Sequence, residues 1–273
     1  MCGALLCAGA VVGILAGPTV TCSFALAGFL DRAAPLPPAP VAIVRVMDRP
    51  FGDVVRLRWE CVDLAATAQR LASWGFSVSP AGGLALPSLQ VAFGRSADGA
   101  DRLRLDDREV DAPTPTGISA PAATSAHPNG ISDLVAVGWA TVDTDRFLAG
   151  TGQVRWERAA DDAHLGAFAQ RTVADIGTGA ILLEPNTEGL LSATLARHGE
   201  GPVALYLRAG PGGLIGLSAA VRAAGGSTSA VRDGPFGPSV LLAGGPVSGP
   251  HLIALQPAAD AGGDGRPAGT IRP

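Results

Sequence analysis

Hydrophobic and polar positions along the chain predict the same series of elements three times over: a strand, a helix and three more strands. In the first copy, alternation over residues 54–60 predicts a strand. A helix follows, with Asp63 as its N-cap and Gly75 at its end. The other strands of this copy are expected at residues 76–79, 89–93 and 102–105.

The second and third copies repeat this order of elements. Strands of the second copy are expected at residues 134–139, 153–157, 168–173 and 180–183, with a short helix behind the cap candidate Asp143. Strands of the third copy are expected at residues 203–208, 228–231, 239–242 and 252–255, with a helix that Gly225 ends. The sequence therefore predicts an α+β fold of repeated βαβββ modules.

Segments without this periodicity divide the chain into predicted domains. Residues 111–130 are rich in Pro, Ala, Ser and Thr and predict a linker, and residues 259–273 predict a disordered tail. The linker separates a single module at residues 47–110 from a pair of modules at residues 131–258.

The first 46 residues form a hydrophobic and Pro-rich extension. Residues 1–30 carry no charge before Asp31 and are long enough to cross a bilayer, but no basic residue flanks them. Three interpretations stay open: a spurious or disordered extension upstream of Met47, a signal peptide or membrane anchor, or a part of the fold. We predict a cytoplasmic protein, or a membrane-anchored or secreted one if residues 1–30 act as anchor or signal.

Composition and charge exclude several classes of chemistry. All 20 basic residues are arginine, so Schiff-base chemistry, a pyridoxal phosphate anchor and a phosphate-loop lysine are excluded. The net charge of −4 and the lack of a clustered basic patch argue against nucleic-acid binding. The cysteines at Cys2, Cys7, Cys22 and Cys61 form neither a disulfide framework nor a zinc motif.

A specific string lies between the second and third copies, from residue 181 to residue 208. A strand ending in LLEP, a helix and then RHGEG before a new strand resembles the glyoxalase-like, vicinal oxygen chelate superfamily. The resemblance is greatest to methylmalonyl-CoA epimerases and to the first domain of hydroxyphenylpyruvate dioxygenases. It covers residues 131–256 and implies that two modules form an open cup of curved sheet. It also implies a divalent metal that His and Glu or Gln side chains hold and that acts as a Lewis acid.

The same resemblance assigns the metal ligands to four positions of this chain. These positions hold Leu134, Ile181, Ala204 and Ala254. None of these side chains offers the N, O or S atom that a divalent metal needs. We therefore expect that the inherited metal site is lost and that no cofactor is bound, and whether the chain is an enzyme stays open.

An alternative keeps a metal-dependent lyase, isomerase or dioxygenase with relocated ligands. The candidate replacements are His164, Glu184, His198 and His251. Each has a simpler interpretation: His164 follows two aspartates in a predicted loop, and His198 lies in the RHGEG turn. His251 is expected on the face opposite Ala254, at the end of a strand.

Three polar residues are the candidates for binding a small molecule. If the former metal positions face inward, alternation places Tyr206, Arg208 and Gln256 in a mostly apolar cup. Arg208 would pair with a carboxylate and Tyr206 would donate a hydrogen bond, so the expected ligand is apolar or bears a carboxylate. The alternative is a cup filled as hydrophobic core, in a structural or interaction module without a ligand.

An odd number of modules suggests association between chains. Two modules close one cup, so the module at residues 47–110 would leave an apolar face exposed. We expect a homodimer in which the first modules of two chains pair. In the other possible arrangement, the first module folds back on the second and third.

Overall fold

The fold is taken from a computed structural model of the chain. The structure describes residues 55–79, 82–105, 127–151, 154–173, 179–243 and 250–257, all of which belong to one compact unit. The predicted N-terminal extension, the predicted tail and the predicted linker up to residue 126 lie outside the described residues. No described helix has both the length and the apolar character that crossing a bilayer requires.

The first module is a four-stranded sheet with one helix. Its elements are β1 (Val55–Cys61), α2 (Leu64–Ser73), β2 (Gly83–Leu86), β3 (Leu89–Arg95) and β4 (Arg102–Leu105). The strand order is β2-β3-β1-β4, with β1 parallel to β3 and antiparallel to β4. The helix begins as predicted, because a carboxylate oxygen of Asp63 accepts a hydrogen bond from the Ala66 N–H at 3.0 Å.

The strand predicted at residues 76–79 does not form, and β2 takes its place in the sheet. Only Ser79 makes a single bridge, to Gly83. The residues before it bond to the last residues of the predicted linker instead. The Ser77 N–H donates to Nδ1 of His127 at 3.0 Å, and the Asn129 N–H donates to the Gly75 carbonyl at 3.0 Å. These contacts replace the ladder that a local alternation pattern predicts.

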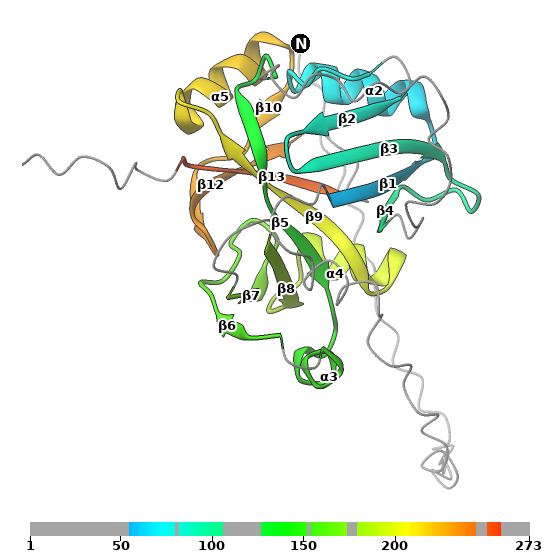
Figure 1. Cartoon of the computed structure of the whole chain (residues 1–273), viewed down its shortest axis with the longest axis vertical. Coiled ribbons are helices and arrows are strands. Elements are labelled where there is room, and N and C mark those ends of the chain that lie inside the picture. The colour runs from blue at the N-terminus through cyan, green and yellow to red at the C-terminus, as the bar shows by residue number, and fades with distance from the viewer. Residues whose placement is uncertain are drawn as a thin grey trace, which may run out of the picture. The chain divides into compact units, whose positions relative to one another are not determined.

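The second and third modules share one nine-stranded sheet (Figure 1). Its strands are β5 (Ile131–Ala140), β6 (Trp156–Arg158), β7 (Ala167–Thr172), β8 (Gly179–Pro185), β9 (Gly201–Ala209), β10 (Ser227–Thr228), β11 (Arg232–Gly234), β12 (Gly237–Ala243) and β13 (His251–Leu255). The strand expected at residues 228–231 is thus replaced by the two short strands β10 and β11.

Both halves of this sheet have the same strand order. In one half the order is β5-β8-β7-β6, and in the other it is β9-β13-β12-β10. In each half, the strand that comes first in the sequence pairs in parallel with the strand that comes last: β5 with β8, and β9 with β13. Strand β5 also pairs antiparallel with β9, which joins the two halves. The predicted α+β fold class is therefore confirmed. Strand β4 of the first module pairs antiparallel with β1, in the same way that β9 pairs with β5 in the larger sheet.

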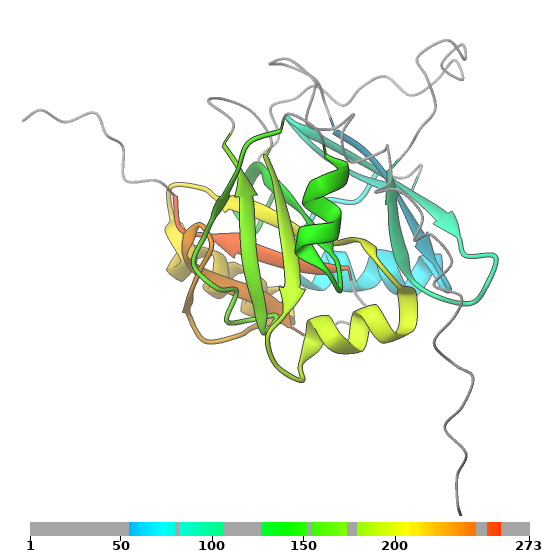
Figure 2. The ribbon, with the colours of Figure 1, turned by 90° about the horizontal axis from the view of Figure 1, so that it is seen from below.

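Two helices cover opposite faces of the sheet at β8 (Figure 2). Helix α3 (Thr144–Gly150) packs Phe147 in a cluster with Leu182. Helix α4 (Leu190–His198) packs Leu191 in a different cluster, with Ile181. Because successive side chains of a strand point to opposite faces, α3 and α4 lie on different sides of β8.

The apolar face of the first module is packed within the chain. Leu57, Trp59 and Leu89 belong to the same buried cluster as Leu207 of β9 and Leu217 of helix α5 (Gly213–Ala223). A polar contact adds to this packing, since a carboxylate oxygen of Asp133 accepts from the Ser88 N–H at 3.0 Å. The contacts are those of the second arrangement considered from the sequence, in which the first module folds back on the others.

Candidate functional site

One face of the nine-stranded sheet corresponds to the predicted cup. We call it the cup face and define it by Ala136, Ile181, Ala204, Tyr206 and Ile253. Tyr206 pairs with Ala136 on one side and with Ile253 on the other, and all five residues are 0% exposed. Helix α4 packs its apolar residues against this face. The cup face is therefore part of the hydrophobic core.

The structure changes the assignment of the four former metal positions to faces. Ile181 and Ala204 lie on the cup face, but Leu134 and Ala254 belong to the buried cluster on the other side of the sheet. The condition from which the inward residues were predicted, that all four positions face the cup, is therefore not met. On β13, His251 pairs with Ala204 and Ile253 with Tyr206, so Ala254 points to the side opposite the cup face. Strand β5 has a register shift between Leu134 and Ala136. Simple alternation fails across such a shift.

Gly138 shows how closely the cup face is packed. A Cβ atom at this position would lie 2.8 Å from Cβ of Ala204 and 3.1 Å from Cδ1 of Leu183 and Cε2 of Tyr206. Even one methyl group therefore has no free space at the centre of this face. The close packing favours a filled core over an open pocket.

The hydroxyl of Tyr206 makes a hydrogen bond inside the protein. It donates to a carboxylate oxygen of Asp162 at 2.6 Å, and Asp162 is 1% exposed. The other oxygen of this carboxylate accepts from the N–H groups of His164 and Leu165, each at 2.9 Å. Burial, followed by the charge of Asp162 and the hydrogen bond to it, raises the pKa of Tyr206 well above 10.0.

The other two predicted ligand residues have different surroundings. Arg208 is exposed, on the same strand as Tyr206. Gln256 is also exposed, and its side-chain oxygen accepts from the Leu214 N–H at 3.3 Å, near the start of α5. The structure thus places one predicted residue in the core, one in solvent and one at a helix start. Their binding of a ligand stays a prediction.

His251 is a buried polar residue that the sequence interpretation placed at a strand end. It lies on the cup face, and its Nε2 is 3.0 Å from the Thr194 hydroxyl oxygen. Because that hydroxyl donates to the Leu190 carbonyl, it accepts from Nε2–H of His251. Burial lowers the pKa of His251 to about 4, although the charge of Asp162 opposes the shift. The spacing of two from Ile253 is the sequence signal for this orientation.

The alternative metal ligands do not come together. Nε2 of His164 lies 3.1 Å from the Ser239 carbonyl, and a carboxylate oxygen of Glu184 accepts from the Thr144 N–H at 3.4 Å, at the start of α3. His198 ends α4. In the part of the chain that the structure describes, no three His, Cys, Asp or Glu residues are grouped closely enough to hold a metal ion. These residues do not fit a divalent metal.

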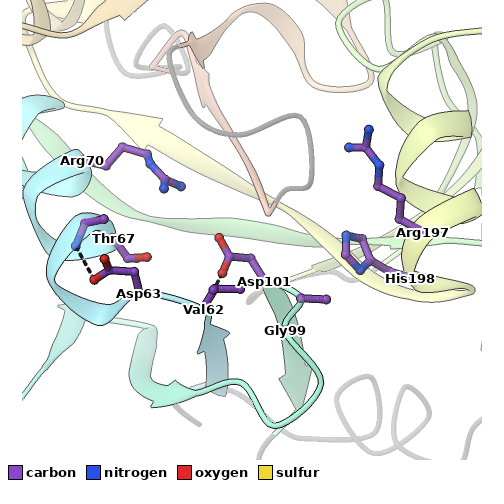
Figure 3. A pocket seen from close by; sticks show the side chains of 10 residues that line it. Val62, Asp63, Thr67, Arg70, Gly99, Asp101, Arg197 and His198 are labelled. Carbon is purple, nitrogen blue, oxygen red and sulfur yellow. Dashed lines mark hydrogen bonds between the residues drawn. The ribbon is translucent and has the colours of Figure 1, made fainter.

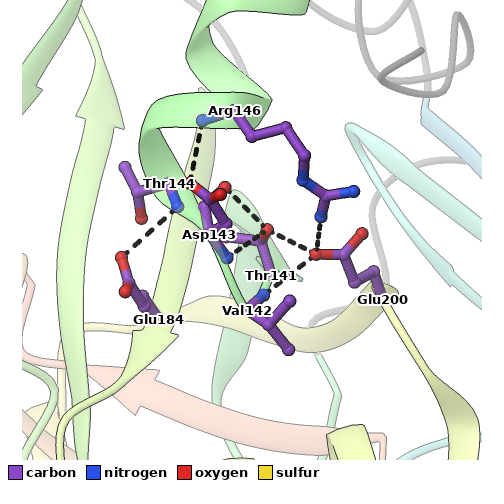
Figure 4. Close-up of polar contacts among 7 residues, drawn as sticks. All are labelled: Thr141, Val142, Asp143, Thr144, Arg146, Glu184 and Glu200. Carbon is purple, nitrogen blue, oxygen red and sulfur yellow. Dashed lines mark hydrogen bonds and ion pairs between the residues drawn. The ribbon is translucent and has the colours of Figure 1, made fainter. Parts of the chain in front are cut away.

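The RHGEG turn ties the end of β5 and the start of α3 to β9 (Figure 4). One carboxylate oxygen of Glu200 accepts from the Thr141 hydroxyl at 2.7 Å and from the Val142 N–H at 2.9 Å, and it forms an ion pair with Arg146. Burial opposes ionisation of Glu200, but these hydrogen bonds and the charge of Arg146 lower its pKa overall. The motif that carries the family resemblance therefore has a structural role here.

A groove of about 540 Å³ lies between the first module and the end of α4 (Figure 3). We call it the α2–α4 groove. Its lining residues are Val62, Asp63, Ala66, Thr67, Arg70, Gly99, Ala100, Asp101, Arg197 and His198. Residues so far apart in the sequence share no local pattern, so the sequence interpretation missed this groove.

The acidic side chains of the α2–α4 groove have hydrogen-bond partners within the protein, and its arginines form no ion pair in the described residues. Asp63 and Asp101 accept from the N–H groups of Ala66 and Val62, the latter at 2.7 Å. Arg70 and Arg197 have no ion-pair partner within the described ranges. Both ring nitrogens of His198 are shielded from solvent and have no hydrogen-bond partner there either. The groove thus has unused hydrogen-bonding capacity on arginine and histidine.

Solved structures similar to this chain include two methylmalonyl-CoA epimerases. The enzyme from Mycobacterium tuberculosis is 17% identical with a TM-score of 0.42, over 47% of this chain and 90% of that one. A variant of the Streptomyces coelicolor enzyme, in complex with 2-nitronate-propionyl-CoA, is 19% identical with a TM-score of 0.37, over 45% and 97%.

A fusion of a xylose isomerase-like TIM barrel with 4-hydroxyphenylpyruvate dioxygenase is also similar, with 12% identity and a TM-score of 0.45 over 86% of this chain and 52% of that one. No family model and no curated protein sequence matches the chain. The two types of protein that the sequence resemblance named thus recur among these structures.

Proposed function

We propose that the chain is a glyoxalase-like protein that binds a small apolar or carboxylate-bearing molecule without metal-dependent catalysis. The observation that carries this proposal is the packing of the cup face. Its residues are apolar apart from Tyr206 and His251, and Ile181 and Ala204 stand fully buried at two positions where the family resemblance expects metal ligands. A divalent metal needs about three or more N, O or S atoms from the protein, which this arrangement does not supply.

Ligand binding in this proposal takes place outside the packed cup. Tyr206 is bonded to Asp162 and acts as a structural residue, while Arg208 is exposed and has no ion-pair partner in the described parts of the chain. Asp133 is its cross-strand partner on β5, but the two side chains form no ion pair, so the Arg208 guanidinium can pair with the carboxylate of a ligand. Of the three predicted ligand residues, Arg208 is therefore the one we propose to pair with the carboxylate of a ligand.

The test is a ligand screen before and after removal of metal. The full chain is heated with a panel of small carboxylates and apolar molecules, untreated and after dialysis against EDTA. A ligand at ten times its Kd stabilises the native state by about 1.4 kcal/mol, which raises the melting temperature by about 3–5 °C. We expect the same shift with and without EDTA. A shift that EDTA abolishes and added divalent metal restores would contradict the proposal, and so would a panel without any ligand.

Association and location stay predictions. The homodimer through the first module was expected because of an exposed apolar face, and that face is packed against β9 and α5. Sedimentation at the mass of one 27.3 kDa chain would refute the homodimer. A cytoplasmic location and the absence of a nucleic-acid partner rest on the composition of the sequence alone.

A further inference from the structure

We infer that the α2–α4 groove binds a small dicarboxylate, and that Arg70 and Arg197 each bind one of its carboxylate groups. The inference rests on the proposed function for the class of ligand, and it places the ligand at a site apart from Arg208. None of the three predicted ligand residues in the third module lines this groove.

The dimensions of the groove suit a small molecule. Its volume of about 540 Å³ falls within the range of about 300–1,000 Å³ that is usual for ligand pockets. Three segments build it: helix α2 from its N-cap Asp63 to Arg70 in its last turn, the loop before β4 and the last turn of α4. Figure 3 shows Arg70 extending from α2 and the Arg197 and His198 side chains on the opposite wall.

The two aspartates and two arginines of the groove balance in formal charge, but they differ in the hydrogen bonds that they already make. The carboxylates of the two acidic residues already accept hydrogen bonds from backbone N–H groups. Asp63 accepts from Ala66 as the N-cap of α2, and Asp101, which is 8% exposed, accepts from Val62. Within the described ranges, the two arginines form no ion pair, whereas five other arginines do. Those five are Arg102, Arg104, Arg146, Arg158 and Arg171. A guanidinium binds a carboxylate through two parallel hydrogen bonds, so two free arginines on facing walls match a ligand with two carboxylates.

His198 and the apolar lining add to this match. His198 lines the groove beside Arg197, and both of its ring nitrogens are shielded from solvent without a partner in the described residues, so a ligand oxygen reaches them only if the ring turns toward the groove. Val62, which is 54% exposed, lies in the lining with Ala66 and Ala100. Their side chains provide an apolar surface for the methylene groups between the two carboxylates.

The experiment measures the affinity of the full chain for three probes by isothermal titration calorimetry. The probes are glutarate, pentanoate of the same carbon chain length, and inorganic phosphate. Each arginine–carboxylate contact that is lost should weaken binding on the order of tenfold. We therefore expect glutarate to bind at least about tenfold more tightly than pentanoate. Equal affinities for these two probes, or tighter binding of phosphate than of glutarate, would overturn the inference.

Substitutions locate the site. Arg70→Gln and Arg197→Gln should each weaken glutarate binding on the order of tenfold, and the double variant should weaken it further. Arg222→Gln is the matched control, since Arg222 is an exposed arginine in the last turn of α5, and it should leave the Kd unchanged. An unchanged Kd in the double variant would overturn the inference.

Further readouts separate this inference from the proposed function. The chain has four histidines, so the ring signals of His198 can be assigned by NMR, and glutarate should shift them in the unaltered protein. If Arg208→Gln abolishes glutarate binding while the groove variants retain it, the site lies at β9. The proposed function then survives and the groove assignment fails. If glutarate binds only after metal is added, the proposed function itself fails.

Discussion

Replacing Tyr206 by phenylalanine should destabilise the fold. The change keeps the aromatic ring, which packs edge-on to Phe236 at a centroid distance of 5.3 Å. It removes the hydroxyl that donates to Asp162 at 2.6 Å, where both residues are almost fully shielded from water. A hydrogen bond to a charged group contributes about 1.5–3 kcal/mol. Asp162 keeps its two backbone donors, so we expect the free energy of unfolding to fall by about 2 kcal/mol.

Two measurements check this prediction. Urea unfolding at pH 7, followed by tryptophan fluorescence, gives the difference in unfolding free energy. An alkaline titration followed at 295 nm reports on the one tyrosine of the chain. The raised pKa of Tyr206 means that the native state keeps a proton that the unfolded state releases above pH 10.0. Stability should therefore fall as the pH rises above this value, and phenolate should appear together with unfolding.

Arg208→Ala is the matched control, two residues further along the same strand. Its side chain is exposed, so the free energy of unfolding should change by less than about 0.5 kcal/mol. The packed-cup interpretation would be refuted if Tyr206→Phe were as stable as the unaltered protein. A phenol that titrates near pH 10 in the folded protein would refute it equally.

Three further substitutions test other parts of the structure. Gly138→Ala should destabilise the fold by about 1–3 kcal/mol in urea unfolding, because the added methyl group would lie 2.8 Å from Cβ of Ala204; an unchanged stability would indicate an open cup. His251 stays neutral in the native state down to about pH 4, while the unfolded state takes up a proton near pH 6.5. Stability should therefore fall as the pH falls between these values, by about 2–3 kcal/mol at pH 4.5. His251→Gln should remove this part of the pH dependence, and an unchanged pH profile in this variant would contradict the assignment. Glu200→Ala should lower the free energy of unfolding by about 1–2 kcal/mol and speed hydrogen exchange at the Val142 amide, which loses its acceptor; unaltered exchange there would contradict this role.

Local features of the fold could be predicted from the sequence. Asp63 and Asp143 were expected as N-caps, and each accepts a hydrogen bond from a backbone N–H three residues later. The short-range pattern of apolar residues also placed β7, β9, β12 and β13 within a few residues of their observed ends. Such features depend on neighbours in the sequence, so alternation and capping residues are sufficient to find them.

Features set by distant contacts could not be predicted in this way. The inward residues of β13 depend on its register against β9, where His251 pairs with Ala204, and no local pattern fixes that pairing. The shift in β5 near Leu134 moves that side chain to the other face. The α2–α4 groove joins residues 62–70 to residues 197–198, which only the packing of the first module brings together.

Metal content is the measurement that bears most directly on the loss of the chelating site. The purified full chain, dialysed without chelator, is analysed by inductively coupled plasma mass spectrometry for divalent metals per chain. Apolar side chains such as Ile181 and Ala204 on the cup face predict a content well below one ion per chain. About one tightly held divalent ion per chain, which dialysis does not remove, would contradict the proposed function.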